Sequence, residues 1–562
     1  MQFKTKLIAS LLVGSGIISA PQLAQANDST ELEQLRQLVQ ELDQKVKILA
    51  RQSEIASEDA AAAKKTTPIV KASEKGFGLQ SADGQNEIKL RGLIQEDYRA
   101  FDSGANEVRN RSDARGGSLN NVTGFHDAND TWVARRLRPT IEGTVFGNYD
   151  FRFTEEFAGG SASVVDAYID GRYDPALNVR IGKYKPFVGL ERLQSGGDIK
   201  FVERSFVSNN ILPNRDQGIS VYGALFDSKL NYAFGLNNGV IDGGNATTGT
   251  SFSGDKEYTA RLFAAPFKDA DNALAGLSFG LGGTYTDTTG EKALNWTDTQ
   301  AADGSRNGLP SYVTDGQNVF FRYSPAVIAD GKRVRVTPQA SYYNGSFGLL
   351  AEYAEVYQQV SLASGGSPAG GGNSTTSGTP PAAVSQTALQ TAVTTILPGS
   401  KKTLKHDAWD IGVTYLVTGE DASFKGIKPK RDFDLKTGGW GAWELVGRYA
   451  EMSLDSATFT NASGALAAQT SADATPTLLQ SYADPTLSAS KAKTWTAGVN
   501  WYLNSNAKIV LNYEQTSFDG GATSGLAYNT TTGASNGYNA ATNKVSNRPD
   551  ERALLARFQV SF

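Results

Sequence analysis

From Glu87 to the C-terminus, apolar and polar residues alternate along most segments of the chain, and this period of two predicts β-strands. The final segment shows the pattern clearly, because Ala556, Phe558, Val560 and Phe562 are apolar and the residues between them are polar. In water, a terminal strand with one apolar face would promote aggregation. Such a strand is stable where its apolar face meets lipid and where closure into a barrel pairs both of its edges. The alternation therefore predicts an all-β transmembrane barrel.

Sixteen segments carry this pattern, which predicts a closed antiparallel barrel of sixteen strands. They span 87–101, 131–145, 150–157, 164–173, 177–184, 216–226, 229–237, 257–265, 275–287, 333–344, 347–361, 404–417, 441–453, 491–503, 507–518 and 551–562. Short turns and long loops separate them in alternation, as in bacterial outer-membrane barrels, where the short turns are periplasmic. The turn at 418–440 is long for the periplasmic side, and Asn318–Ser324 is expected to lie in an external loop.

The alternation also assigns faces to the strand at 131–145. The residues expected to face lipid are Val133, Leu137, Ile141 and Val145, which directs Arg136 and Arg138 into the lumen. Strict alternation would place Arg135 outside, where a charge at mid-membrane is costly. We therefore expect Arg135 either to lie near the rim or to be turned inward by a β-bulge.

A helical segment precedes the strands. A heptad seam runs through it, formed by Leu32, Leu35, Val39, Leu42, Val46 and Leu49. Because a helix this short is marginal alone, residues 27–52 are expected to associate as a coiled coil; packing on its own domain is the alternative. Val at a and Leu at d favour two strands, whereas a trimer would need support from the attached barrel. Residues 53–75 are expected to be a flexible linker, and 76–562 the barrel domain.

The first 26 residues have the features of an export signal. Lys4 and Lys6 precede an apolar run from Leu7 to Ala20, and Ala24-Gln25-Ala26 supplies the small residues of a cleavage site. We expect residues 1–26 to be a signal peptide; an uncleaved anchor helix is the alternative, although the apolar run is short for a span. Export and a barrel together predict the bacterial outer membrane, with the coiled coil in the periplasm.

Composition argues against several other function classes. The absence of cysteine excludes a thiol nucleophile and a thiolate metal site, and a net charge of −4 gives no sign of a nucleic-acid partner. The only histidines, His126 and His406, lie in no hydrolase motif and at no metal-ligand spacing. We therefore expect no enzyme, no metal and no cofactor. A mean hydropathy of −0.34 would suggest a soluble protein, but in barrels only alternate residues are apolar.

The densest positive charge lies between Arg172 and Arg204 and continues into the third external loop, residues 185–215. Gly189, Gly196 and Gly197 allow this loop to fold tightly and to narrow a wide barrel from inside. Arginine and lysine side chains at such a narrowing would favour anions by charge and by direct hydrogen bonding. The arginine fork matches the oxygen atoms of phosphate or carboxylate in pairs.

Several motifs in and near this loop carry a resemblance. They are Lys183-Tyr184-Lys185-Pro186-Phe187-Val188-Gly189-Leu190-Glu191-Arg192-Leu193-Gln194-Ser195, Phe201-Val202-Glu203-Arg204, Pro213-Asn214-Arg215-Asp216, Arg135-Arg136 and Asp166-Ala167-Tyr168-Ile169-Asp170. With them the chain resembles the phosphate-selective porin O and P family from about Gly76 to Phe562. The resemblance implies a sixteen-stranded outer-membrane barrel that assembles as a homotrimer and whose third loop folds inward to form an anion site.

The resemblance also suggests which residues line the constriction. The matching positions are Arg135, Arg136, Asp166, Arg192, Ser195 and Arg204, with Lys89 at a basic position of the first strand. Charge and position add Arg138, Lys183 and Lys185 to the expected anion site. In place of the family's long arginine ladder, the chain offers an expected anion funnel of Arg322, Lys332, Arg333 and Arg335. Leu93 stands where the family has a further basic residue, although Arg91 is near.

These expectations lead to one main function and two alternatives. The main hypothesis is a diffusion porin with a basic constriction, whose partners are outer-membrane lipid and small anions such as phosphate, pyrophosphate or carboxylates. One alternative is a general or dicarboxylate porin without phosphate specificity. The other is a barrel whose coiled coil tethers the outer membrane to the periplasm.

Overall fold

In a computed structural model, the chain forms two compact units, residues 1–67 and 68–562. The described residues are 28–73, 76–102, 130–160, 162–246, 254–290, 307–323, 327–362, 401–460, 481–483, 485, 488–521, 538–539, 544–545 and 547–562. The expected signal peptide, residues 1–26, lies outside them.

The first unit contains one helix, α1, which spans Asp28–Thr66. The predicted linker is therefore wrong over 53–66, because the run Ala60–Ala63 and the following lysines favour a helix, which ends before Pro68. On the heptad seam, the side chains of Leu35, Val39, Leu42, Val46 and Leu49 are all exposed. No helix among the described residues is both long and apolar enough to span a membrane.

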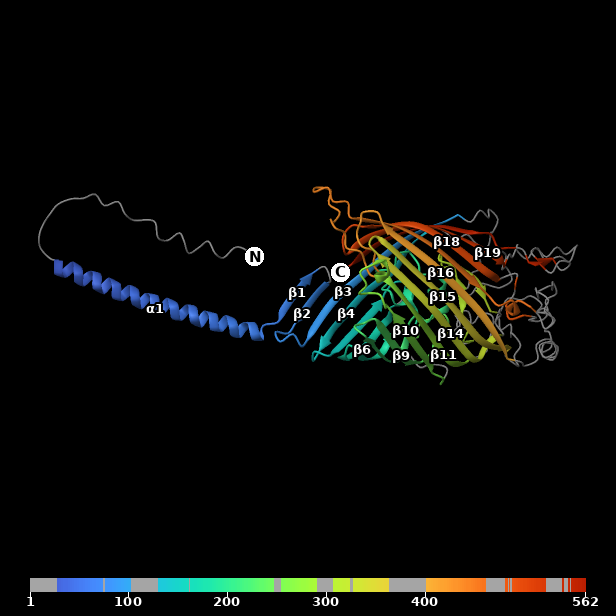
Figure 1. Cartoon of the computed structure of the whole chain (residues 1–562), viewed down its shortest axis with the longest axis horizontal. Coiled ribbons are helices and arrows are strands. Elements are labelled where there is room, and N and C mark those ends of the chain that lie inside the picture. Colours follow the sequence, from blue (N-terminus) through green and yellow to red (C-terminus); the bar gives the residue numbers. More distant parts are fainter. Residues whose placement is uncertain are drawn as a thin grey trace, which may run out of the picture. The chain divides into compact units, whose positions relative to one another are not determined.

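The second unit confirms the predicted barrel of sixteen long antiparallel strands, which Figure 1 shows tilted side by side. These strands are β3 (Glu87–Phe101), β4 (Thr131–Val145), β5 (Tyr149–Glu156), β6 (Ser163–Asp174), β7 (Leu177–Tyr184), β8 (Asp216–Leu225), β9 (Leu230–Asn237), β10 (Glu257–Ala264), β11 (Leu277–Thr289), β14 (Val327–Asn344), β15 (Phe347–Leu362), β16 (Lys402–Leu416), β17 (Ala442–Ser453), β18 (Ala489–Tyr502), β19 (Ala507–Gly520) and β22 (Glu551–Ser561). Each pairs with its neighbour in the chain, and β22 pairs with β3 to close the barrel.

A short hairpin, absent from the sequence-based prediction, precedes the first long strand. Its strands are β1 (Ile69–Ser73) and β2 (Gly76–Gln80), so the predicted linker is also wrong over 69–73. Strand β2 pairs with Glu87–Leu90 of β3, and β22 pairs with the same strand from Leu93 onward. The hairpin and the last strand thus pair with successive parts of β3.

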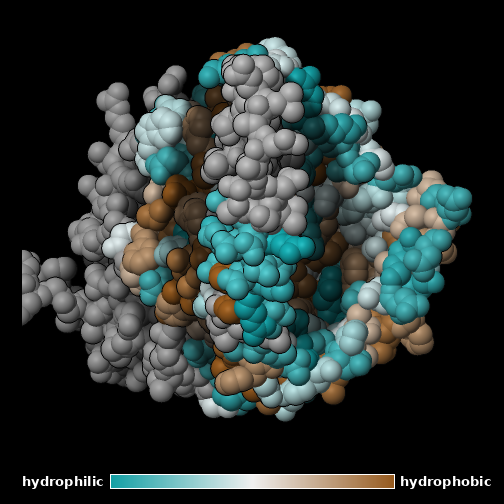
Figure 2. Space-filling model, turned by 90° about the vertical axis from the view of Figure 1, so that its left-hand side faces the viewer, coloured by the Kyte–Doolittle hydropathy of each residue, from teal (hydrophilic) through white to brown (hydrophobic). Residues whose placement is uncertain are grey.

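The wall of the barrel has the predicted polarity. Outward positions such as Ile141, Leu281 and Phe558 are exposed, whereas inward Arg335, Asn500 and Arg557 are buried. The exposed apolar residues of the strands are the ones that a hydrocarbon environment would cover. Figure 2 views the molecule from one end, where hydrophobic and hydrophilic residues are interspersed.

A β-bulge interrupts β4 at Arg135, since Gln95 pairs with Arg136 and the next residue, Glu96, pairs with Ala134. An inward turn at a β-bulge is one of the two placements expected for Arg135. The bulge also reverses which residues of β4 face inward and outward in the part of the strand that precedes it. The lipid-facing prediction for Val133 is therefore wrong: Trp132 and Ala134 are exposed, and Val133 pairs with Asp97, whose side chain is buried.

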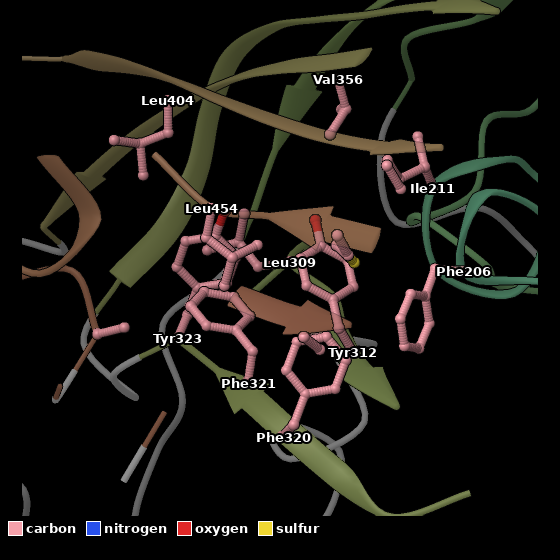
Figure 3. Packing of buried hydrophobic residues seen from close by; sticks show 14 of the residues in the cluster. Phe206, Ile211, Leu309, Tyr312, Phe320, Phe321, Tyr323, Val356, Leu404 and Leu454 are labelled. Atoms are coloured by element: carbon pink, nitrogen blue, oxygen red, sulfur yellow. The ribbon is translucent and has the colours of Figure 1, made fainter. Parts of the chain in front are cut away.

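Part of the lumen is filled by an apolar cluster. Between β11 and β14, the short strands β12 (Ser311–Val313) and β13 (Val319–Arg322) pair with each other. The segment Asn318–Ser324 was expected to lie in a loop; its described residues, 318–323, do lie between two barrel strands but contain β13. Figure 3 shows Tyr312, Phe320, Phe321 and Tyr323 packed beside Leu454, with strand residues Val356 and Leu404 nearby. The remaining short elements are α2 (Leu190–Leu193), η2 (Val207–Ile211), η3 (Ala273–Gly276), η4 (Ser456–Thr458), β20 (Tyr538–Asn539) and β21 (Lys544–Val545).

Candidate functional site: a basic constriction and vestibule

The third external loop, residues 185–215 and here called L3, folds into the barrel as expected. It contains the short helices α2 and η2, and most of its side chains are buried. At its start, the carbonyl of Val188 accepts a hydrogen bond of 2.8 Å from Gln339 of β14. The carboxylate of Glu352 on β15 accepts from the backbone N–H groups of Leu190 and Glu191 at 2.6 and 2.8 Å. The first half of L3 is therefore fixed to one side of the wall.

The middle of L3 is fixed to another part of the barrel wall. Gln95 of β3 and Gln559 of β22 donate to the carbonyls of Gly196 and Gly197, both at 2.9 Å. Further along L3, Lys508 donates to the carbonyl of Ile199, and Asn500 donates to the carbonyl of Lys200. The backbone N–H of Val202 donates to the side chain of Asn512. In the closed order of strands, β3 and β22 lie far around the barrel from β14 and β15. L3, which is attached to both pairs of strands, therefore crosses the lumen and narrows it.

Several cations on and around L3 have only neutral acceptors. Arg204 donates to the carbonyls of Glu191 and Gln194 at 3.3 and 2.7 Å, and Lys185 donates to the carbonyl of Gln194 at 2.8 Å. Arg136 donates to the amide oxygen of Gln95 at 2.5 Å, and Arg192 donates to the carbonyl of Ser208. These hydrogen bonds orient the cations, and none of the four forms an ion pair with a carboxylate in the part of the chain that the structure describes.

Two of these guanidinium groups also have an unused donor. The Nε atoms of Arg136 and Arg192 are buried and have no hydrogen-bond acceptor in the described part of the chain. The two side chains are only 3% and 4% exposed, so the missing acceptor is not replaced by open solvent contact. A buried cationic donor without an acceptor is costly, and a small anion would satisfy both the charge and the donor.

The electrostatics of the loop reflect this crowding of cations. Burial, with Arg204 and Arg215 close by, lowers the pKa of the Lys185 ammonium well below its usual value. Burial also lowers the pKa of Arg204, to about 10. In both groups burial is the largest cause, and neighbouring arginines lower the pKa further.

Other cations of the predicted site are neutralised. The carboxylate of Glu203 on L3 accepts from Arg135 at 2.5 and 3.0 Å and from Arg99 at 2.8 Å. Burial acts to raise the pKa of Glu203, but the two arginines outweigh it and hold the pKa well below its usual range. Arg138 is paired with Glu156 at 2.6 Å. These arginines are therefore bound to carboxylates of the protein.

The remaining members of the predicted site have different surroundings. Asp166 accepts from Arg215 at 3.0 Å, and the hydroxyl of Ser195 accepts from the backbone of Gly197 at 3.3 Å. Lys183 is buried, and its ammonium forms no hydrogen bond or ion pair with any described residue. Lys89 lies near the start of β3 and pairs with Glu87 at 2.9 Å, away from L3.

The four residues of the expected anion funnel do not form a continuous set. Arg322 and Lys332 are exposed, on β13 and β14. Arg333 and Arg335 are buried: Arg335 pairs with Asp242 at 2.7 Å and with Glu257 at 2.5 Å, and Arg333 approaches Glu257 at 3.5 Å. Arg333 and Arg335 thus serve as counter-ions of internal carboxylates and are not free to attract anions.

A cavity of about 1500 Å³ extends from L3 to the short-turn end of the barrel. We call it the vestibule. Its cationic lining residues are Arg91, Arg138, Arg152, Arg180, Lys185, Arg215, Arg261, Lys425, Lys428 and Lys508, and its carboxylates are Asp166 and Asp198. The space below the constriction is therefore strongly biased toward positive charge.

The long turn between β16 and β17 contributes to this cavity. Its residues Phe424–Lys428 line the vestibule, and the carbonyl of Lys425 accepts from Lys200 of L3 at 3.2 Å. The sequence marked this turn as unusually long without predicting that it enters the lumen. The sequence-based site also omitted Arg152, Arg261 and Lys508, although all three occupy inward positions of alternating strands, a signal that could have identified them.

Comparison with known proteins supports this architecture. Residues 89–363 and 379–532, more than half of the chain, match the model of the family described as phosphate-selective porin O and P. A comparison with curated proteins found no match.

Among solved structures, the chain is similar to outer-membrane expressed OmpT of Vibrio cholerae (9% identity, 85% of this chain and 98% of that chain, TM-score 0.43). It is also similar to the outer membrane channel DcaP of Acinetobacter baumannii (13%, 87% and 100%, TM-score 0.43). A third is the anion-selective porin from Comamonas acidovorans (12%, 85% and 100%, TM-score 0.42).

Proposed function

Because the chain belongs to the phosphate-selective porin O and P family, we propose that this outer-membrane porin is a diffusion channel whose L3 constriction favours anions. The observation that carries the proposal is the set of cations whose only acceptors are carbonyl or amide oxygens. Arg136, Lys185, Arg192 and Arg204 belong to this set, and two of them keep a buried Nε without an acceptor. These cations are buried in and beside L3, and positive charge held in the low-dielectric wall of a narrow passage favours the entry of anions over cations.

Reversal potentials in planar bilayers test this proposal. Across a KCl gradient, the purified protein should be anion-selective, and Arg136→Gln and Arg204→Gln should each lower the anion/cation permeability ratio by about twofold or more. Arg431→Gln is the matched control, because Arg431 is an exposed arginine of the long turn. Cation selectivity of the wild type would overturn the proposal, as would equal effects of all three substitutions in folded protein.

For the anion itself, we propose phosphate or a related oxyanion, with dicarboxylates as the alternative. The support is geometric: arginine forks on L3 can bind two oxygens of one anion, and the family name carries the same expectation. Addition of phosphate should reduce the chloride current at a lower concentration than sulfate or succinate does. If succinate is the stronger blocker, the organic-acid alternative replaces phosphate specificity.

We further propose that the protein assembles as a homotrimer with α1 on the periplasmic side. Two observations support this: the chain enters the barrel at the short-turn end, and the seam of α1 exposes Leu35, Val39, Leu42, Val46 and Leu49. Exposed heptad residues are stabilised by further copies of the same helix. This arrangement can coexist with conduction, so a tethering role for α1 is an addition to the pore function.

A further inference from the structure

One wall of the vestibule is aromatic as well as cationic. Tyr168 of β6, Tyr184 at the end of β7, Phe187 of L3 and Tyr222 of β8 all line the cavity. Their rings surround the Arg180 guanidinium, whose Cζ lies 4.3 Å from the ring centroid of Tyr168 and 5.1 Å from that of Phe187. The rings of Phe187 and Tyr222 are themselves 4.7 Å apart.

The charge of this aromatic group is already balanced. Arg180 pairs with Asp170 at 2.6 Å, and the hydroxyl of Tyr222 donates to the same carboxylate at 2.5 Å. Arg180 is therefore not the cation that would bind an incoming anion. What the group offers to the cavity is apolar ring surface.

A cation without an ionic partner lies two strands away. Arg261 of β10 donates through Nε and Nη2 to the neutral amide oxygen of Gln339, at 2.9 and 2.8 Å, and forms no ion pair with any described carboxylate. Its Cζ lies 4.4 Å from the ring centroid of Phe263, which also lines the vestibule. Arg261 is thus positioned to bind a carboxylate beside aromatic surface.

The sheet register fixes the spacing between the aromatic group and Arg261. Tyr222 pairs with Ala233 of β9, and Ala233 pairs with Arg261, so the three residues form one row across the wall. Two strand spacings separate Tyr222 from Arg261 by about 10 Å at the backbone. Between them Ala233, which is 5% exposed, contributes only a methyl group, and all three residues line the cavity.

We propose that this wall, formed by Phe187, Tyr222, Ala233 and Arg261, is a binding subsite for aromatic carboxylates. The ring of such an anion can lie over Ala233 against Phe187 and Tyr222, while its carboxylate reaches Arg261. Inorganic phosphate and short aliphatic acids gain nothing from ring surface, so the wall distinguishes organic from inorganic anions. This inference rests on the proposed anion-selective channel and names an additional substrate class for it.

Current block by matched acids tests the subsite. In planar bilayers, benzoate, cyclohexanecarboxylate, acetate and phosphate are added from the short-turn side, and the concentration that halves the chloride current is measured. Benzoate should act at a concentration about tenfold lower than acetate and several-fold lower than cyclohexanecarboxylate. Phe187→Leu should remove the preference for benzoate over cyclohexanecarboxylate, and Arg261→Gln should weaken block by both acids.

Phe234→Leu is the control, because Phe234 lies on the same sheet but is exposed on its outer face. This substitution should leave all four blocking concentrations unchanged. Equal block by benzoate and cyclohexanecarboxylate, or a Phe187→Leu variant with an unchanged benzoate preference, would overturn the subsite. In either case an anion-selective KCl reversal potential would leave the proposed function intact, whereas a cation-selective one would reject the proposed function itself.

Discussion

Glu203 determines how many cations of the constriction remain available. Its carboxylate binds Arg135 and Arg99, and with both arginines held at hydrogen-bond distance neither is free for a passing anion. Arg204, the next residue, has only carbonyl acceptors. Adjacent residues of L3 therefore have opposite effects: one neutralises positive charge and the other supplies it.

Replacing Glu203 by glutamine should therefore increase anion selectivity. The amide keeps the shape of the side chain but leaves the charges of Arg135 and Arg99 uncompensated, so the anion/cation permeability ratio should rise by about twofold. Reversal potentials measure this ratio, and Glu54→Gln in the exposed part of α1 is the control. A lower or unchanged ratio in correctly folded protein would contradict this reading of Glu203.

Selectivity should also depend on pH. Because burial and nearby arginines lower the pKa of Lys185, its ammonium loses its proton, and thus its charge, at a lower pH than an exposed lysine does. As the pH is raised toward the pKa of an exposed lysine, about 10.4, the anion/cation permeability ratio should fall. In the Lys185→Arg variant this ratio should fall less over the same pH range, since arginine holds its proton more strongly. Equal decline in both proteins would exclude Lys185 as the titrating group.

At the scale of single residues, the sequence predicted part of the candidate site. Charge and family motifs identified Arg136, Arg192 and Arg204, because residue type alone marks a cation. They could not separate these from Arg335, because the difference lies in partners: Asp242 and Glu257, which neutralise Arg335, come from distant parts of the chain. The same limit applies to Arg261, whose importance depends on the neutral Gln339 opposite it.

At the scale of secondary-structure elements, the position of L3 depends on a glycine in the neighbouring strand β11. A Cβ atom at Gly282 of β11 would lie 2.4 Å from the carbonyl oxygen of Val188, which is a backbone atom. The glycine therefore lets the start of L3 approach the wall, where Gln339 bonds the same carbonyl. The position of the start of L3 is therefore tied to this contact.

Gly282→Ala should accordingly displace L3 and alter the pore. Because the backbone at Val188 must shift, single-channel conductance should change measurably, with more variable open levels than in the wild type. Gly447→Ala is the matched control, since a Cβ there lies 3.7 Å or more from its neighbours. Identical conductance in the two variants would show that the contact at Val188 does not set the pore width.

The strands were the most predictable elements and the connections the least. Alternation located every long strand because each one has one face toward the lumen and one toward lipid, and this constraint applies along its whole length. The β1–β2 hairpin was missed because five-residue strands rich in small residues carry little periodicity. The inward fold of the turn at Phe424–Lys428 depends on partners in L3, which local sequence does not encode.

For the whole molecule, the exposed seam of α1 predicts that assembly depends on this helix. Val39→Lys combined with Val46→Lys should weaken association, because two charges at a positions are costly in a coiled coil. The oligomer should then dissociate at a lower temperature on native gels, while conductance per pore stays the same. Lys45→Ala, at an exposed position of the same helix, is the control. Unchanged oligomer stability in the double variant would assign α1 to tethering alone.

The bond between Gln95 and Gln559 joins the first and last long strands at 2.6 Å, and each glutamine also holds one glycine of L3. Half of that attachment comes from β3 and half from β22, the two strands whose pairing closes the barrel. Until these two strands have paired, the amide pair that grips Gly196 and Gly197 cannot form, whatever other contacts L3 has made. Closure of the cylinder and the final seating of L3 are thereby coupled steps of folding.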